Sequence, residues 1–164
     1  MINVLFVCWG NICRSPMCEF VMKDLVEKAG LADQFHIESA ATSSEEIWGG
    51  VGNPVYPPAR EELAKHGLSC EGKRARKLTA EDYENYDYLI GMEDQNIRNM
   101  LRILGRDPEH KVRKLLSFAG LERGIADPWY TGDFRSTYRD VELGCSAFLK
   151  QVMKEKGLYG TKKD

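Results

Sequence analysis

Residues 2–17 of the chain read INVLFVCWGNICRSPM, and this stretch decides the fold. Residues 2–8 form a run that is apolar except for Asn3, which is typical of a strand that is covered on both faces of a sheet. A short polar segment follows it. Pro16 then suits the first turn of a helix, because the N–H that proline lacks would have no partner there. The stretch therefore predicts a strand, a tight loop and a helix, in that order.

The rest of the chain repeats this alternation of strands and helices. Apolar runs predict three further strands, at 35–41, 86–91 and 111–117. Amphipathic patterns predict helices at 17–29, 58–66, 94–104, which Asp94 would cap, and about 134–156. We therefore expect one α/β domain over residues 1–158: an open, doubly wound sheet of four parallel strands with helices on both faces. The charged tail 159–164 is expected to be frayed.

Composition and charge narrow the class of protein. The chain has 164 residues and a formal net charge of −2, which argues against a dedicated nucleic-acid-binding protein. The local basic run Lys73–Lys77 is interpreted as a solvated loop or helix end. The start of the chain lacks the pattern of a signal peptide, and no apolar stretch approaches the length of a membrane span. We therefore expect a cytoplasmic protein that binds neither nucleic acid nor membranes.

The cysteines and histidines point away from disulfides and metals. The five cysteines, at positions 8, 13, 18, 70 and 145, are too sparse for a secreted disulfide scaffold. The three histidines stand singly, and no paired CxxC motifs accompany them. We expect no metal and no cofactor, and the sequence gives no indication of the oligomeric state.

The loop after the first strand has the composition of an anion site. Cys8 stands at the carboxyl end of the strand, where open parallel sheets bind ligands. Five residues separate it from Arg14, so the intervening backbone can curl and direct its N–H groups at a tetrahedral dianion. Arg14 adds a planar fork for two phosphate oxygens. The same positive field stabilises a Cys8 thiolate, the form that attacks phosphorus.

The small polar residues of this loop fit the same interpretation. Gly10 permits a close approach of the backbone, and Asn11 tolerates the left-handed conformation that a tight loop demands. Ser15 could donate a hydroxyl hydrogen bond to the sulfur. On spacing alone a second interpretation stays open, in which Cys8 is a buried residue at a strand end and Arg14 lies on the surface.

A general acid is needed to protonate the leaving oxygen, and Asp127 is the best candidate. Pro128 biases it toward an extended conformation in a loop, where a side chain can project. Trp129 and Tyr130 beside it resemble the wall of a substrate pocket. Trp48 is a further candidate for that wall. The alternatives are a turn or capping role for Asp127 and local packing for Trp48.

Four segments together resemble the low-molecular-weight protein tyrosine phosphatases, over essentially the whole chain. Val7–Met17 is similar to the phosphate loop of that family almost residue for residue. Ser39–Ser43 resembles the segment that leads into its variable substrate loop, and Asp87–Met92 resembles its third strand. Asp127–Tyr130 resembles its general-acid loop.

The resemblance implies a two-step hydrolysis of phosphotyrosine without metal or cofactor. The Cys8 thiolate would attack phosphorus while Asp127 protonates the tyrosine oxygen, and Asp127 would then activate water. Arg14 would stabilise the charge in both transition states. Trp9, Gly10, Asn11, Ile12, Cys13 and Ser15 would complete the phosphate site. The implied partners are tyrosine-phosphorylated proteins, with phosphate-like anions as inhibitors.

By the same resemblance, Cys13 would form a reversible disulfide with Cys8 and so protect it from irreversible oxidation. The other possibility is that Cys13 is a small loop residue without a redox role.

The sequence also departs from the family pattern. Trp9 stands where leucine is common, and Cys18 replaces a usual alanine, which we interpret as packing. The segment 44–54 is longer than the typical loop, so the position of Trp48 stays open.

Two other functions are weighed against the phosphatase. A thiol-dependent arsenate reductase would share the fold and the Cys-x5-Arg loop, but it needs further cysteines to relay oxidation. Cys70 and Cys145 are far apart in the sequence. A catalytically silent phosphate-binding module would not need Asp127.

Overall fold

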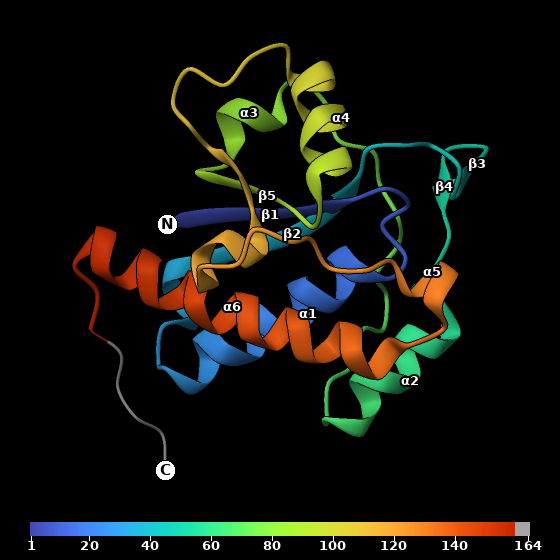
Figure 1. Ribbon diagram of the computed structural model, residues 1–164, viewed down its shortest axis with the longest axis horizontal. Helices are drawn as coiled ribbons and strands as arrows, with labels where there is room; N and C mark the ends of the chain where they lie inside the picture. Colours follow the sequence, from blue (N-terminus) through green and yellow to red (C-terminus); the bar gives the residue numbers. More distant parts are fainter. Residues whose placement is uncertain (160–164) are drawn as a thin grey trace.

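The computed structural model describes residues 1–159, and its centre is a four-stranded parallel sheet (Figure 1). The strands lie in the order β2, β1, β5, β6 and span Phe35–Ala41, Ile2–Cys8, Tyr88–Gly91 and Val112–Lys114. All neighbouring pairs are parallel. The predicted open sheet of four parallel strands is therefore confirmed.

Helices cover both faces of this sheet, as predicted. They are α1 (Arg14–Lys28), α2 (Pro57–Lys65), α3 (Asp82–Asn85), α4 (Asp94–Leu104), α5 (Pro128–Thr131) and α6 (Phe134–Lys156), with a short 3-10 helix η1 at Ala32–Gln34. Figure 1 shows α1, α2 and α6 below the sheet and α3 and α4 above it. Strands that are covered in this way bury both faces, which explains why β1 is apolar from Val4 to Cys8.

The two cores follow from the alternation of side chains along β1. Val4 and Phe6 belong to the core between the sheet and helices α1 and α6. Leu5 and Val7 belong to the core between the sheet and helices α3 and α4. Phe6 meets Phe148 of α6 edge to face, with ring centroids 6.1 Å apart. β1 is thereby fixed between two apolar layers, and its carboxyl end at Cys8 is firmly positioned.

Several predicted boundaries differ from the structure, and two of the differences affect the core and a helix cap. Residues 115–117 do not extend β6 but begin the 3-10 helix η2 (Leu115–Ala119), which turns both Leu115 and Leu116 into the core. The cap of α4 is Glu93 rather than Asp94: Glu93 and Asn96 form a reciprocal capping box, and Asp94 is the first helical residue.

The segment 44–54 contains a small antiparallel hairpin that the sequence pattern did not predict. Its strands are β3 (Ile47–Trp48) and β4 (Val51–Gly52), with Trp48 opposite Val51. The turn consists of Gly49 and Gly50, which have φ values of 56° and 80°. Glycine adopts this left-handed backbone freely, so the pair allows a two-residue turn.

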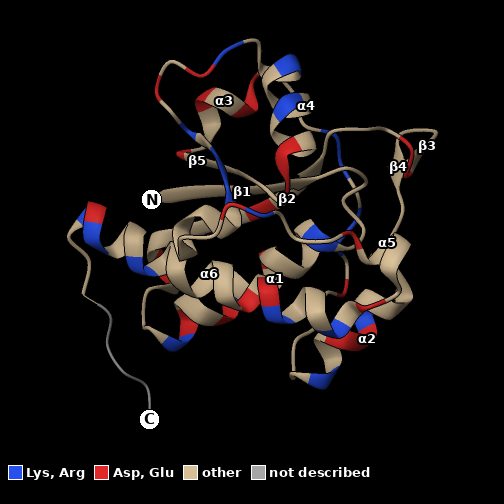
Figure 2. Ribbon diagram, in the orientation of Figure 1, with Lys and Arg blue, Asp and Glu red and all other residues tan. Residues whose placement is uncertain are grey.

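The basic run at 73–77 is only partly the solvated segment that its composition predicts: Arg74 and Lys77 are exposed, whereas Lys73 and Arg76 make contacts within the fold. Arg76 pairs with Asp82, at 3.1 Å, and Lys73 is largely buried against Glu19. Charges of both signs are interspersed over the helices (Figure 2). Two of its four basic residues, Lys73 and Arg76, therefore serve contacts within the fold.

Of the tail that we expected to be frayed, residues 160–164 lie outside the described part of the chain. No helix within residues 1–159 combines the length and the apolar character that crossing a membrane requires.

Candidate active site

The loop between β1 and α1 lies at the topological switch point of the sheet. Cys8 ends β1, and α1 begins at Arg14. From β1 the chain continues to β2 on one side, and β5 lies on the other side. Open α/β sheets bind ligands at this place, outside the carboxyl ends of the strands. The loop thus has both the position and the free N–H groups of an anion site.

Asn11 sets the shape of this loop. It is buried and has a φ of 60°, in the left-handed region that its short polar side chain tolerates. Its Nδ2 donates to Ser15 Oγ at 2.8 Å and to Ser39 Oγ at 2.9 Å, and its Oδ1 accepts from the backbone N–H of Arg76 at 3.1 Å. All polar atoms of the side chain are used within the fold, and the backbone N–H is directed at Cys8 Sγ, 3.3 Å away.

The Cys8 sulfur is surrounded by groups that favour negative charge. Ser15 Oγ lies 3.0 Å from Sγ, and the N-terminus of α1 begins beside it. Helix N-termini and hydrogen-bond donors stabilise a thiolate relative to a thiol. The loop is therefore suited to a nucleophilic sulfur as well as to an anion.

Arg14 is buried and anchored from the far side of the site. Its Nη1 donates to the carboxylate of Glu93 and, at 2.8 Å, to the carbonyl oxygen of Ile125. Its Nη2 lies 3.4 Å from Asp127 Oδ2. Burial alone would lower the pKa of Arg14, but the negative charges of Cys8, Asp127 and Glu93 outweigh burial and raise it. Arg14 therefore keeps its charge throughout the accessible pH range.

Glu93 is a site residue that the sequence pattern did not single out. It follows β5, the parallel neighbour of β1, so its side chain reaches the edge of the sheet where Cys8 lies. The loop that carries Ile125 passes so close to it that a Cβ at Gly124 would come within 2.9 Å of Glu93 Cα. The sequence signal that could have found Glu93 is an acidic residue two positions after a predicted strand, 86–91.

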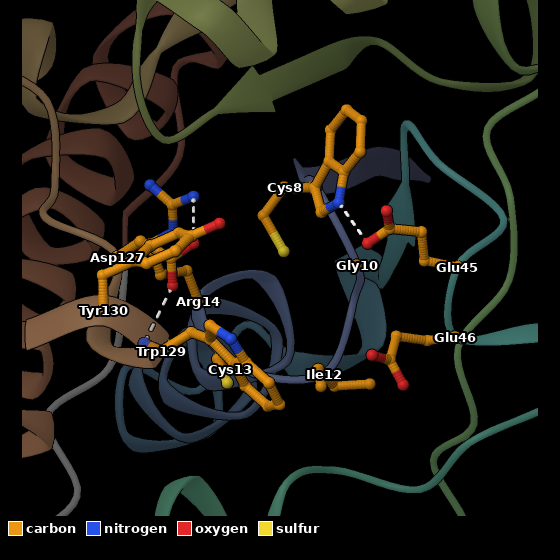
Figure 3. A pocket seen from close by; sticks show the side chains of 11 residues that line it. Cys8, Gly10, Ile12, Cys13, Arg14, Glu45, Glu46, Asp127, Trp129 and Tyr130 are labelled. Atoms are coloured by element: carbon orange, nitrogen blue, oxygen red, sulfur yellow. Dashed lines mark hydrogen bonds and ion pairs between the residues drawn. The ribbon is translucent and has the colours of Figure 1, made fainter. Parts of the chain in front are cut away.

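Asp127 caps the short helix α5 and faces Arg14 at the same time. Its Oδ1 accepts from the backbone N–H of Trp129 at 3.0 Å, while its Oδ2 is the oxygen nearest to Arg14 (Figure 3). The capping role and the catalytic role that the sequence left open are thus compatible, because each uses a different carboxylate oxygen.

A cavity joins these groups (Figure 3). Its floor is formed by Cys8, Gly10, Ile12, Cys13 and Arg14, and its rim by Trp9, Glu45, Glu46, Asp127, Trp129 and Tyr130. Asn11 and Ser15 are buried behind the floor and do not line the cavity. The structure therefore brings together a thiol, a guanidinium and a carboxylate that are up to 119 residues apart (127 − 8).

Comparison with known proteins decides the family. The family model described as low molecular weight phosphotyrosine protein phosphatase matches residues 3–158. The chain belongs to this family. It is therefore a protein-tyrosine-phosphatase, a phosphoric monoester hydrolase.

Individual relatives support the assignment. The low molecular weight protein-tyrosine-phosphatase YfkJ of Bacillus subtilis is 36% identical over 160 residues, which cover 96% of this chain and 100% of that protein. The crystal structure of YfkJ matches with a TM-score of 0.89, covering 95% of this chain and 97% of that one at 35% identity. The structure of a Drosophila arginine phosphatase matches with a TM-score of 0.81 and 31% identity, over 92% and 98% of the two chains.

The expected aromatic wall of the phosphatase is only partly assembled. Trp129 and Tyr130 line the cavity, and the Trp129 ring packs on Tyr56 with centroids 4.8 Å apart. Trp48 does not line it: the glycine turn of the hairpin carries the indole outward, where it is 74% exposed. From the same segment, Glu45 and Glu46 line the cavity instead. Trp9 Nε1 donates a hydrogen bond to the carboxylate of Glu45 at 2.8 Å.

The cysteines of the phosphatase differ in their surroundings. Cys13 lines the cavity together with Cys8, and burial, followed by the negative charge of Cys8, raises the pKa of its thiol. Cys18 is completely buried, with its sulfur 3.5 Å from that of Met92, as a packing residue would be. Within residues 1–159 no three His, Cys, Asp or Glu side chains are grouped so that they could bind a metal ion.

Proposed function

We propose that the phosphatase hydrolyses phosphotyrosine through a cysteinyl-phosphate, with Cys8 as nucleophile, Arg14 as phosphate ligand and Asp127 as general acid and base. The observation that carries this proposal is the convergence of all three groups on one cavity at the switch point of the sheet. Their chemistry is complementary: the thiolate attacks, the guanidinium binds oxygens and the carboxyl group moves a proton.

In the first step the loop N–H groups and Arg14 bind the phosphate oxygens. The Cys8 thiolate attacks phosphorus, so that an S–P bond forms while the P–O bond to the phenolic oxygen breaks. Asp127 gives its proton to that oxygen, and tyrosine leaves as a neutral phenol. Ser15, 3.0 Å from the sulfur, stabilises its negative charge before the attack.

In the second step the ionised Asp127 accepts a proton from a water molecule. The oxygen of that water molecule, as it loses its proton, attacks phosphorus. The S–P bond breaks, which releases inorganic phosphate and the Cys8 thiolate. Arg14 stabilises the charge on the phosphoryl oxygens in both transition states. Because Glu93 and Ile125 anchor its guanidinium, this stabilisation requires no reorganisation.

The rim of the cavity supports an aromatic substrate. Trp9, Trp129 and Tyr130 line the cavity and are exposed, so their rings have faces free for an aromatic substrate. A phenyl ring on these faces would place its phosphate at Cys8, whereas a serine side chain is shorter and makes no such contact. We therefore infer that the partners are tyrosine-phosphorylated proteins, and that free phosphate-like anions compete for the loop.

A substrate profile in the presence of a chelator tests this function. Phosphotyrosyl peptides are expected to be hydrolysed about a hundredfold or more faster than matched phosphoseryl peptides, because only the former use the aromatic rim. Arsenate with thioredoxin should give negligible turnover. Phosphoarginine belongs in the profile because one structural relative is an arginine phosphatase.

Two outcomes of this profile would contradict the proposal. Faster turnover of phosphoarginine than of phosphotyrosine would change the substrate class. Arsenate-dependent thioredoxin oxidation without phosphotyrosine hydrolysis would instead favour the reductase.

We further propose that Cys13 protects Cys8 from irreversible oxidation, as suits a reactive thiol in the cytoplasm. Peroxide would convert the Cys8 thiolate to a sulfenic acid. The Cys13 thiol would then condense with it, forming a disulfide and releasing water. Both cysteines lie in the floor of the same cavity, which supports this pairing.

The Cys13→Ser variant tests the protective role. After brief exposure to peroxide, dithiothreitol should restore most of the activity of the parent enzyme but little of the activity of the variant, because sulfinic acid is not reduced by thiols. Recovery of activity is measured after removal of peroxide by catalase. Equal recovery in both proteins would show that Cys13 has no such role.

A further inference from the structure

Trp9 forms part of the rim of the cavity, directly after the strand that ends at Cys8. Trp9 is 41% exposed, so packing alone does not fix its ring. The single polar atom of the indole, Nε1, donates a hydrogen bond to Glu45 Oε2 at 2.8 Å (Figure 3). The position of the indole at the rim therefore depends on a carboxylate from another segment of the chain.

Glu45 belongs to a segment that follows the phosphate loop closely. The backbone N–H of Thr42 donates to the carbonyl oxygen of Cys8 at 2.9 Å, and that of Ser43 donates to the carbonyl oxygen of Trp9 at 3.0 Å. Two residues beyond this contact, the carboxylate of Glu45 reaches the indole. The acceptor is therefore carried by backbone that is itself bound to the residue whose side chain it holds.

A second hollow beside the cavity offers space for the indole. Trp9, Glu45 and Tyr130 line both hollows, and the second one extends past Glu93 and Thr131. Exposed side chains change rotamer quickly when nothing holds them. Without a partner for Nε1, the indole would be free to turn from the cavity toward the second hollow.

Charge alone does not explain Glu45. A carboxylate at the rim repels a phosphate dianion, so it weakens the binding of every phosphate ligand. Glu46 lines the same cavity and carries the same charge, but its Oε2 accepts from Asn53 Nδ2 at 2.7 Å. The contact with Trp9 is what distinguishes Glu45 from Glu46.

We propose that Glu45 positions the Trp9 indole as one wall of the phosphotyrosine site, and thereby sets how strongly the enzyme prefers an aryl phosphate to phosphate alone. An indole held at the rim gives the phenyl ring of the substrate a preformed surface. Inorganic phosphate lacks the ring and gains nothing from that surface. Glu45 is a positioning residue, because it acts through Trp9. This role rests on the proposed hydrolysis of phosphotyrosine.

The test measures two dissociation constants for each protein, by titration calorimetry in a Cys8→Ser background that does not turn over. One ligand is an otherwise uncharged phosphotyrosyl peptide, and the other is inorganic phosphate. The dissociation constant of phosphate divided by that of the peptide is the aryl preference. Repulsion by a carboxylate acts on both ligands and cancels in this ratio.

Glu45→Ala is expected to lower the aryl preference about five- to tenfold, because the indole loses its partner. Glu45→Gln should lower it only about twofold, since the amide oxygen still accepts from Nε1, though more weakly. The matched control, Glu46→Ala, should change both dissociation constants by the same factor and leave the ratio within about twofold of the parent. With Cys8 intact, Glu45→Ala should have a higher KM for para-nitrophenyl phosphate than Glu46→Ala, at a similar kcat.

A double-mutant cycle establishes whether Glu45 acts through the indole. Trp9→Phe keeps an aromatic ring but removes the N–H, so it should lower the aryl preference by an amount similar to that of Glu45→Ala. Adding Glu45→Ala to Trp9→Phe should then have no further effect on the ratio.

An unchanged aryl preference in Glu45→Ala would overturn the inference, as would an equal loss in Glu46→Ala or an undiminished effect of Glu45→Ala in the Trp9→Phe background. Retained binding of inorganic phosphate shows that the phosphate loop of each variant is folded. If Trp9→Phe does not fold, the comparison of Glu45→Ala with Glu45→Gln and Glu46→Ala decides the question. The binding ratio needs no turnover, so a protein that fails to hydrolyse phosphotyrosine contradicts the proposed function while the ratio still decides the role of Glu45.

Discussion

The Cys8→Ser variant is expected to lose about four orders of magnitude or more in kcat toward para-nitrophenyl phosphate. A serine hydroxyl keeps its proton at neutral pH, and the field of the phosphate loop that favours a thiolate cannot ionise it. The rate is measured in a chelator, so that hydrolysis by a contaminating metal is excluded.

Cys70→Ser is the matched control for this variant. Cys70 is also buried, but it does not line the cavity, so its replacement should leave turnover close to that of the parent. Cys8→Ser should still bind inorganic phosphate, seen as an upward shift of Tm, because the N–H groups and Arg14 are unchanged. Equal turnover by Cys8→Ser and the parent would refute the covalent mechanism.

The Asp127→Ala variant is expected to hydrolyse phosphotyrosine about a thousandfold more slowly. Tyrosine is a poor leaving group that needs a proton, whereas para-nitrophenolate leaves readily without one. The loss on para-nitrophenyl phosphate should therefore be smaller, about tenfold. The measurement is kcat over a series of aryl phosphates whose leaving groups differ in basicity.

Two further variants separate acid catalysis from capping. Asp127→Asn keeps an oxygen for the N–H of Trp129 but cannot donate a carboxyl proton, so it should resemble Asp127→Ala in rate. Asp133→Ala removes the corresponding cap of α6, outside the cavity, and should cost about 1 kcal/mol of stability with little effect on rate. An equal loss on all aryl phosphates for Asp127→Ala would indicate a structural role.

The central architecture could be predicted from the sequence because each element carries its own pattern. β1 is apolar on both faces, and Pro16 follows at the start of α1. Parallel strands of this type require helical crossovers, so their order along the chain limits the topology strongly. The loop from Cys8 to Arg14 could be placed at the edge of the sheet for the same reason.

Other features depend on which segments become neighbours in space. Glu93 contacts Arg14 because β5 lies beside β1, and no local pattern encodes that adjacency. Trp48 is a candidate for the cavity wall on its sequence, but Gly49 and Gly50 form a turn beside it, and its side chain is exposed. Lys73 was interpreted as solvated because its partner, Glu19, is distant in sequence.

The double use of Asp127 links the stability of a short segment to the stage of the reaction. α5 has only four residues, and one oxygen of Asp127 supplies its side-chain cap. A carboxylate accepts a hydrogen bond more strongly than a carboxylic acid does. In the proposed cycle Asp127 gives up its proton in the first step, so the cap of α5 becomes stronger as the cysteinyl-phosphate forms. The transfer of one proton would therefore tighten the segment that carries Trp129 and Tyr130 at the stage when the phenol leaves.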